Sequence, residues 1–153
     1  MSLSEIRNFI EIDGRTATGG QPSEAQLRDA RAQGFEAILN LAPDGLETSL
    51  AEEANLVAAL GMRYHHIPVM WSNPRPEDLD AFMRTMDALT GRRVLIHCQA
   101  NFRVTAFYGI YAVRRLGWAE QQASDLIDSV WARQPGAMDE TWRAFIADGM
   151  ARR

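Results

Sequence analysis

The chain has 153 residues, 46% of them hydrophobic and 24% charged, and its formal net charge is −4. These values are typical of one soluble globular domain and give no electrostatic basis for binding nucleic acid or an anionic membrane. No apolar run approaches the roughly 20 residues of a membrane span, residues 1–13 lack a signal-peptide pattern, and one cysteine suits a reducing compartment. We therefore expect a single domain over residues 1–153, located in the cytoplasm.

The first elements predicted are a hairpin and a helix. Two short segments, 9–12 and 16–18, are separated by Asp13-Gly14, a dipeptide typical of tight turns between strands. Ser23 and Gln26 then form a capping-box pattern that begins a helix, which ends at Gly34.

Strands and helices alternate through the middle of the chain. The predicted strands, all rich in apolar residues, are 35–42, 62–69 and 93–97. A second capping-box pattern, Ser49 with Glu52, predicts a helix that ends at Gly61. A proline-containing loop at 70–76 precedes a helix at 77–90, whose apolar residues recur at steps of three and four.

Everything after Arg103 is predicted to be helical, in three segments that end near Leu116, near Trp131 and beyond Ile146. This order predicts an α/β fold, with a largely parallel central sheet of about four or five strands flanked by helices and a helical C-terminal third. Ligands bind beyond the carboxyl ends of the strands in such sheets. Three segments lie at such ends: Pro43-Asp44, Val69-Met70 and Cys98.

Residues 94–105 carry the most specific chemical signal in the chain. They comprise a buried strand, the chain's single cysteine, a short loop that reaches Arg103, and the start of a helix. The N-terminus of a helix and the free N–H groups of a loop favour a thiolate and a bound oxyanion. Arginine adds a planar set of donors that can hold two phosphate oxygens. We therefore predict that Cys98 is a nucleophile and that Arg103 binds an anion, with His97 hydrogen-bonded in the core to orient the loop.

His97-Cys98 through Arg103 and Thr105 resemble the signature loop of cysteine-dependent protein tyrosine and dual-specificity phosphatases. The wider match is to a bacterial branch of atypical dual-specificity phosphatases, which includes the phosphatase-like domain of some β-lactamase hydrolase-like proteins. The segments that carry this match are Thr18-Gly19-Gly20-Gln21-Pro22-Ser23, Gly34-Phe35, Ile38-Leu39-Asn40-Leu41, Tyr64-His65-His66-Ile67-Pro68-Val69, Arg115-Leu116-Gly117-Trp118 and Trp131.

The resemblance implies a phosphoric monoester hydrolase that needs no metal or organic cofactor. Its Cys98 thiolate would attack phosphorus and form a cysteinyl-phosphate, which water then hydrolyses. Thr105 would hydrogen-bond the cysteine and assist the second step. Phosphate would be held by the Arg103 guanidinium and by the amides of Gln99, Ala100, Asn101, Phe102 and Arg103. The partner would be a phosphorylated protein or small molecule, of a class that the sequence does not specify.

The loop departs from the family pattern in its length. Four residues separate Cys98 from Arg103 where relatives have five, and the usual central glycine is absent. Either the loop is one residue tighter, or it keeps its path and Arg103 enters from the preceding position. The missing glycine argues against a residue with positive φ in the loop, although Asn101 tolerates that conformation better than most residues.

The proton donor is the second departure. Relatives place an aspartate in the loop that follows Ile67-Pro68-Val69, but here no acid occurs before Glu77 and Asp78. We rank Asp78 first as the general acid and Asp44 second. Both have plainer interpretations, because acidic residues favour the first turn of a helix and Asp-Gly favours a turn. Trp71, in the same loop, is a candidate wall for the pocket.

Two other functions fit the same residues. A sulfurtransferase of the rhodanese type would carry a persulfide on Cys98, although the all-helical sequence after Arg103 disfavours it. A phosphate-binding module without turnover would explain the missing aspartate. Neither the substrate nor the oligomeric state follows from the sequence.

Overall fold

The structure, a computed structural model that describes residues 2–152, is built around a five-stranded sheet with strand order β1-β2-β5-β3-β4. Only β1 is antiparallel to its neighbour. The strands are β1 (Ile10–Glu11), β2 (Thr16–Gly19), β3 (Ala37–Asn40), β4 (Arg63–His66) and β5 (Val94–His97). The predicted α/β fold with a largely parallel sheet is therefore confirmed, and β5 lies between two parallel partners at its centre.

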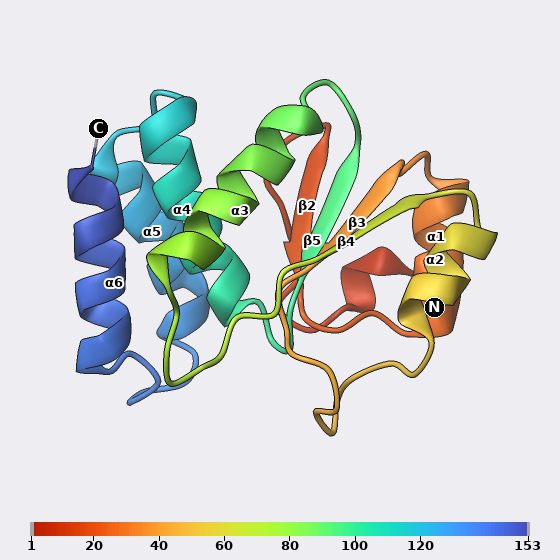
Figure 1. The fold of residues 1–153 in the computed structure, drawn as a ribbon, viewed down its shortest axis with the longest axis horizontal. Helices are drawn as coiled ribbons and strands as arrows, with labels where there is room; N and C mark the ends of the chain where they lie inside the picture. Colours follow the sequence, from red (N-terminus) through yellow and green to blue (C-terminus); the bar gives the residue numbers. More distant parts are fainter. Residues whose placement is uncertain (1, 153) are drawn as a thin grey trace.

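Helices cover both faces of this sheet (Figure 1). Alternate residues of the central strands point to opposite faces, so Ile38 and Leu95 pack with one cluster and Leu39 and Ile96 with the other. The first cluster is closed by a short 3-10 helix (Leu3–Glu5), α1 (Glu24–Ala32) and α2 (Glu53–Ala59). The second is closed by α3 (Pro76–Ala88), α4 (Phe102–Arg115), α5 (Glu120–Trp131) and α6 (Glu140–Ala151).

The helix that follows the signature loop, α4, is the most deeply enclosed element. All its residues from Phe102 to Val113 are buried, between the sheet and the helices α3, α5 and α6. Gly109 allows α5 to pack closely, because a Cβ there would lie 3.1 Å from Ile127 Cδ1. No helix within residues 2–152 is both long and apolar enough to cross a bilayer.

One predicted helix start is wrong. The capping box at Ser49 does not form, and α2 begins at Glu53, after Glu52 in the left-handed region at φ 60°. Instead, Ser49 Oγ accepts from the Leu46 amide at 3.0 Å, while the Ser49 amide donates to Leu46 O at 3.0 Å. The serine therefore closes a turn in the loop after β3, a competing use of short polar side chains.

The capping box at Ser23 does form, and it makes a test of helix α1. Ser23 Oγ accepts from the Gln26 amide at 3.1 Å, and Gln26 Oε1 accepts from the Ser23 amide at 2.8 Å. Ser23→Ala should lower the free energy of unfolding by about 1 kcal/mol, measured by urea denaturation. Ser129→Ala, on the exposed face of α5, is the control and should change it by less than about 0.5 kcal/mol. Equal losses in both variants would contradict the capping role.

Candidate active site

Cys98 lies directly after β5, at the carboxyl end of the sheet. Its amide donates to Gly19 O at 3.2 Å, and the preceding carbonyl, of His97, accepts from the Leu41 amide at 2.8 Å. The ends of β2 and β3 therefore hold the cysteine from both sides. Cys98 is fully buried, at 0% exposure.

The backbone that follows β2 lies against the loop. Gly20 and Ala100 form an antiparallel bridge, and the Gln21 amide donates to Gln99 O at 3.3 Å. A Cβ on Gly20 would lie 2.7 Å from Gln99 O and 3.2 Å from Ala100 Cα. Both are backbone atoms that cannot rotate away, so this approach requires glycine.

Asn101 supplies the conformation that the missing glycine would otherwise provide. It has φ 71° and precedes the first residue of α4, so the expectation that no loop residue adopts positive φ is wrong. Its buried side chain donates from Nδ2 to Asn8 O at 2.8 Å and to Thr18 Oγ1 at 3.0 Å. Asn8 in turn donates to Ala100 O at 2.9 Å. These bonds stabilise a left-handed residue that is otherwise unfavourable.

Arg103 is buried in the first turn of α4 and is held by the loop that follows β4. Its Nε donates to Val69 O at 2.9 Å, and its guanidinium carbon lies 5.2 Å from the centre of the Trp71 ring. Burial lowers the pKa of Arg103, while its interaction with Cys98 raises it; the guanidinium remains charged. Because Val69 uses only Nε, the two terminal amino groups can hold a pair of phosphate oxygens.

A cavity of about 640 Å³ opens beside this arginine. One side of the cavity is formed by the loop after β5 and the start of α4, and another by the segment between α5 and α6. The lining residues are Arg7, Leu46, Trp71, Gln99, Ala100, Phe102, Arg103, Gln134, Pro135, Gly136, Ala137 and Asp139. Trp71, predicted as a candidate wall of the pocket, does line the cavity and is held in place by tryptophans of α5 and α6. Trp142 Nε1 donates to Trp71 O at 2.9 Å, and the rings of Trp71 and Trp131 stack at 5.5 Å.

Thr105 makes local contacts in the first turns of α4. Its Oγ1 lies 2.9 Å from Asn101 O and 3.1 Å from Phe102 O, and it accepts from Trp131 Nε1 at 3.1 Å. These contacts link the loop's end to α5.

The structure does not bring the predicted acids Asp78 and Asp44 to the cavity beside Arg103. The Asp78 side chain is 5% exposed, caps α3 and pairs with Arg75 Nη2 at 2.7 Å. Asp44, at 92% exposure, lies 4.0 Å from His66 Nδ1 and lines a second cavity of about 480 Å³. Asp139, which sequence reasoning missed, does line the cavity and accepts from the Trp142 amide at 3.0 Å.

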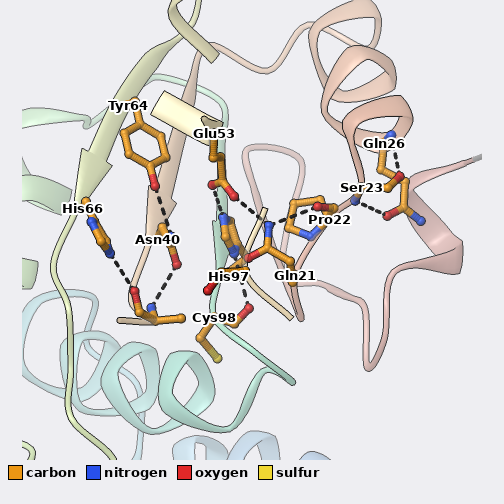
Figure 2. Close-up of polar contacts among 12 residues, drawn as sticks. Gln21, Pro22, Ser23, Gln26, Asn40, Glu53, Tyr64, His66, His97 and Cys98 are labelled. Atoms are coloured by element: carbon orange, nitrogen blue, oxygen red, sulfur yellow. Dashed lines mark hydrogen bonds and ion pairs between the residues drawn. The ribbon is translucent and has the colours of Figure 1, made fainter. Parts of the chain in front are cut away.

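Behind the cysteine lies a buried ion pair, shown in Figure 2. His97 Nε2 is 2.6 Å from Glu53 Oε2, and His97 Nδ1 is 3.3 Å from Cys98 O. Burial tends to raise the pKa of Glu53, but the hydrogen bond and charge of His97 outweigh it, so the pKa is lowered. No sequence signal singled out Glu53, since an acid at a helix start is ordinarily exposed. Within residues 2–152, no three His, Cys, Asp or Glu side chains converge as a metal site requires.

The role of Asn101 can be measured with a matched pair of variants. Asn101→Gly keeps the backbone conformation and removes the two side-chain hydrogen bonds, which should destabilise the protein by about 1–3 kcal/mol. Asn101→Ala loses the same bonds and adds left-handed strain, so it should be less stable than the glycine variant by about 1 kcal/mol. Urea denaturation measures both. An alanine variant as stable as the glycine variant would show that the backbone conformation costs nothing.

The sequence matches a known family model over most of its length. The model is that of the beta-lactamase hydrolase-like protein, phosphatase-like domain, and it covers residues 11–114. A beta-lactamase hydrolase-like protein of Xylella fastidiosa is 32% identical over 108 residues, which are 69% of this chain and 25% of the relative. One from Agrobacterium fabrum is 33% identical over 102 residues, 65% of this chain and 23% of the relative. The chain therefore spans about a quarter of the length of these relatives.

Solved structures extend the similarity to the whole fold. A DUF442 protein of Shewanella putrefaciens is 30% identical with a TM-score of 0.86, over 97% of this chain and 95% of that one. The core catalytic domain of the PP-IP phosphatase SIW14 of S. cerevisiae is 17% identical with a TM-score of 0.73, over 93% of this chain and 85% of that one. The latter shows a shared fold alone. Together these findings confirm the resemblance seen in the sequence: the chain belongs to the family of phosphatase-like domains found in beta-lactamase hydrolase-like proteins.

Proposed function

We propose that this protein is a cysteine-dependent phosphatase that hydrolyses phosphoric monoesters through Cys98. The observation that carries the proposal is the junction of β5 and α4, where a loop that begins at the buried Cys98 and ends at the buried Arg103 lines one cavity with Gln99, Ala100, Phe102 and Arg103. The 14-residue helix α4 adds the partial positive charge of its N-terminus. A dianionic phosphoryl group matches this charge and this set of donors.

The reaction has two steps in this site. The Cys98 thiolate attacks phosphorus, an S–P bond forms, and the ester P–O bond breaks while an acid protonates the leaving oxygen. Arg103 and the amides of residues 99–103 hold the three remaining oxygens as charge moves onto them. Water then attacks phosphorus, the S–P bond breaks, and inorganic phosphate and the thiolate are released. Thr105, close to the loop's end, is proposed to assist this second step, as the resemblance implies.

Asp139 is the best-placed proton donor among the candidate acids. It lines the cavity beside Arg103, whereas Asp78 pairs with Arg75 and Asp44 lines the other cavity. We therefore rank Asp139 before Asp78 and Asp44.

A phosphate-binding module without turnover is the second candidate function. It is favoured by one observation: the loop that follows β4 offers Trp71 and no acid, where the family resemblance implies an aspartate. Such a module would bind phosphate through Arg103 and the loop amides but would not hydrolyse the ester.

Substitutions at the nucleophile and the arginine test the proposed function. Cys98→Ser should lower the turnover of p-nitrophenyl phosphate by about 1,000-fold or more, because the hydroxyl is not ionised. Arg103→Lys should lower it by about 100-fold, since lysine keeps the charge and loses the paired donors. Steady-state kinetics and vanadate binding are the measurements.

Three outcomes would contradict the proposed function. Full turnover in Cys98→Ser would show that Cys98 is not the nucleophile. Vanadate binding without any wild-type turnover, with phosphotyrosine peptide and p-nitrophenyl phosphate, would favour the binding module. Turnover of thiosulfate with a persulfide on Cys98 would favour sulfur transfer.

The proton donor can be identified by changing the leaving group. Asp139→Asn should lower the hydrolysis of an alkyl phosphate by about 100-fold or more and that of p-nitrophenyl phosphate much less, because nitrophenolate leaves without a proton. The general acid must be protonated, so the decline of wild-type kcat at high pH should disappear in the variant. Asparagine still caps a helix, which preserves α6. Asp78→Asn and Asp44→Asn are the matched comparisons, and the same changes in either would assign the role there.

A further inference from the structure

Both ring nitrogens of His97 face hydrogen-bond acceptors. His97 is fully buried, and its ring nitrogens face Glu53 Oε2 at 2.6 Å and Cys98 O at 3.3 Å. A carboxylate oxygen and a carbonyl oxygen both accept hydrogen bonds and donate none. A neutral imidazole carries only one N–H group, so the ring can donate to both acceptors at once only in its doubly protonated, cationic form.

The Glu53 carboxylate is arranged to remain ionised. Its second oxygen, Oε1, accepts from Gln21 Nε2 at 2.6 Å, so both oxygens act as acceptors (Figure 2). Gln21 is itself part of the segment that lies against the signature loop, where its amide donates to Gln99 O. A carboxylate with two donors and a cation beside it is strongly favoured in its charged form, even when it is buried.

Other titratable groups within residues 2–152 lie near the pair. Tyr64 and His66 on β4 interact with Glu53, and Asp44 after β3 interacts with Tyr64. Burial raises the pKa of Tyr64 to about 12, which keeps that phenol neutral. His66 is 2.6 Å from Ala42 O, and Asp44 is exposed. Glu53 is therefore the carboxylate that directly contacts His97.

We propose that Glu53 is a positioning residue for the nucleophile. It keeps His97 doubly protonated, so that the ring donates to the Cys98 carbonyl and holds a positive charge beside the thiolate. Glu53 never touches the substrate; it acts through His97, which orients the first peptide of the phosphate-binding loop. This inference rests on the proposed function of Cys98 but assigns a further role, to a helix outside the signature sequence.

Glu53→Gln tests the proposal, because glutamine has nearly the same shape and no charge. The thiolate titration of Cys98, followed by the rate of iodoacetamide alkylation against pH, should move to higher pH by about 1–3 units. The low-pH limb of kcat/KM should move by the same amount. Glu52→Gln, an exposed neighbour with the same change in charge, is the matched control and should leave both curves in place.

Two further measurements separate this role from a structural one. Nitrogen NMR of the wild type should show His97 with both nitrogens protonated at neutral pH, and Glu53→Gln should show one N–H. In a His97→Asn background, Glu53→Gln should produce no further shift of the alkylation curve. Circular dichroism and vanadate binding check that each variant is folded.

The alkylation experiment needs no turnover, so it distinguishes the two proposals. Absent turnover with a shifted alkylation curve would reject the phosphatase and retain the role of Glu53. An unchanged alkylation curve in folded Glu53→Gln, or a neutral His97 in the wild type, would overturn the role of Glu53 whatever the enzyme does.

Discussion

The site depends on the contact between two stretches of backbone, residues 19–21 and residues 98–100. Three backbone interactions join them: the Cys98 amide to Gly19 O, the Gly20–Ala100 bridge, and the Gln21 amide to Gln99 O. They are possible because Gly20 carries no Cβ. A loop with only four residues between cysteine and arginine has little conformational freedom of its own, and this contact with the N-terminal segment holds its first half. Asn101 and its bonds to Asn8 and Thr18 hold the second half.

The proposed form of the buried site is balanced in charge. With His97 doubly protonated, as proposed, and Arg103 cationic, the anionic Glu53 and a thiolate on Cys98 would bring the sum to zero. Each of these side chains is at most 5% exposed. Such a cluster is costly to bury if one member is missing, since an unpaired charge in a protein interior costs several kcal/mol. In the proposed reaction, the anionic substrate would then meet the terminal amino groups of Arg103, the loop amides and the N-terminus of α4.

The sequence predicts the parts of this arrangement that depend on local patterns. The strand before Cys98, the helix after it and the sheet class follow from apolar periodicity, and Ser23 with Gln26 behaves as its motif predicts. Ser49 fails because its hydroxyl is used by Leu46 within a loop turn, which a four-residue pattern cannot distinguish from a helix cap. Glu53 and Asp139 were missed for a different reason: their places beside His97 and the cavity result from chain segments that meet only in the folded protein. The tryptophans of α5 and α6 are core residues that also support Trp71.

The cavity is lined by two regions of the chain, one inside the family match and one outside it. Its floor, at residues 99–103, lies within the stretch that the family model matches, whereas the opposite wall, at 134–139, lies beyond residue 114 where that match ends. The wall connects α5 to α6, and Trp131 in the last turn of α5 packs against Phe102 of the floor, with the ring centres 5.2 Å apart. Changes in the connection between these two helices can therefore reshape what the cavity admits while the nucleophile and its loop stay as they are. Because Asp139, the proposed proton donor, also lies in this wall, the region beyond the family match would supply both the shape of the cavity and the proposed acid, whereas the matched region supplies the proposed nucleophile.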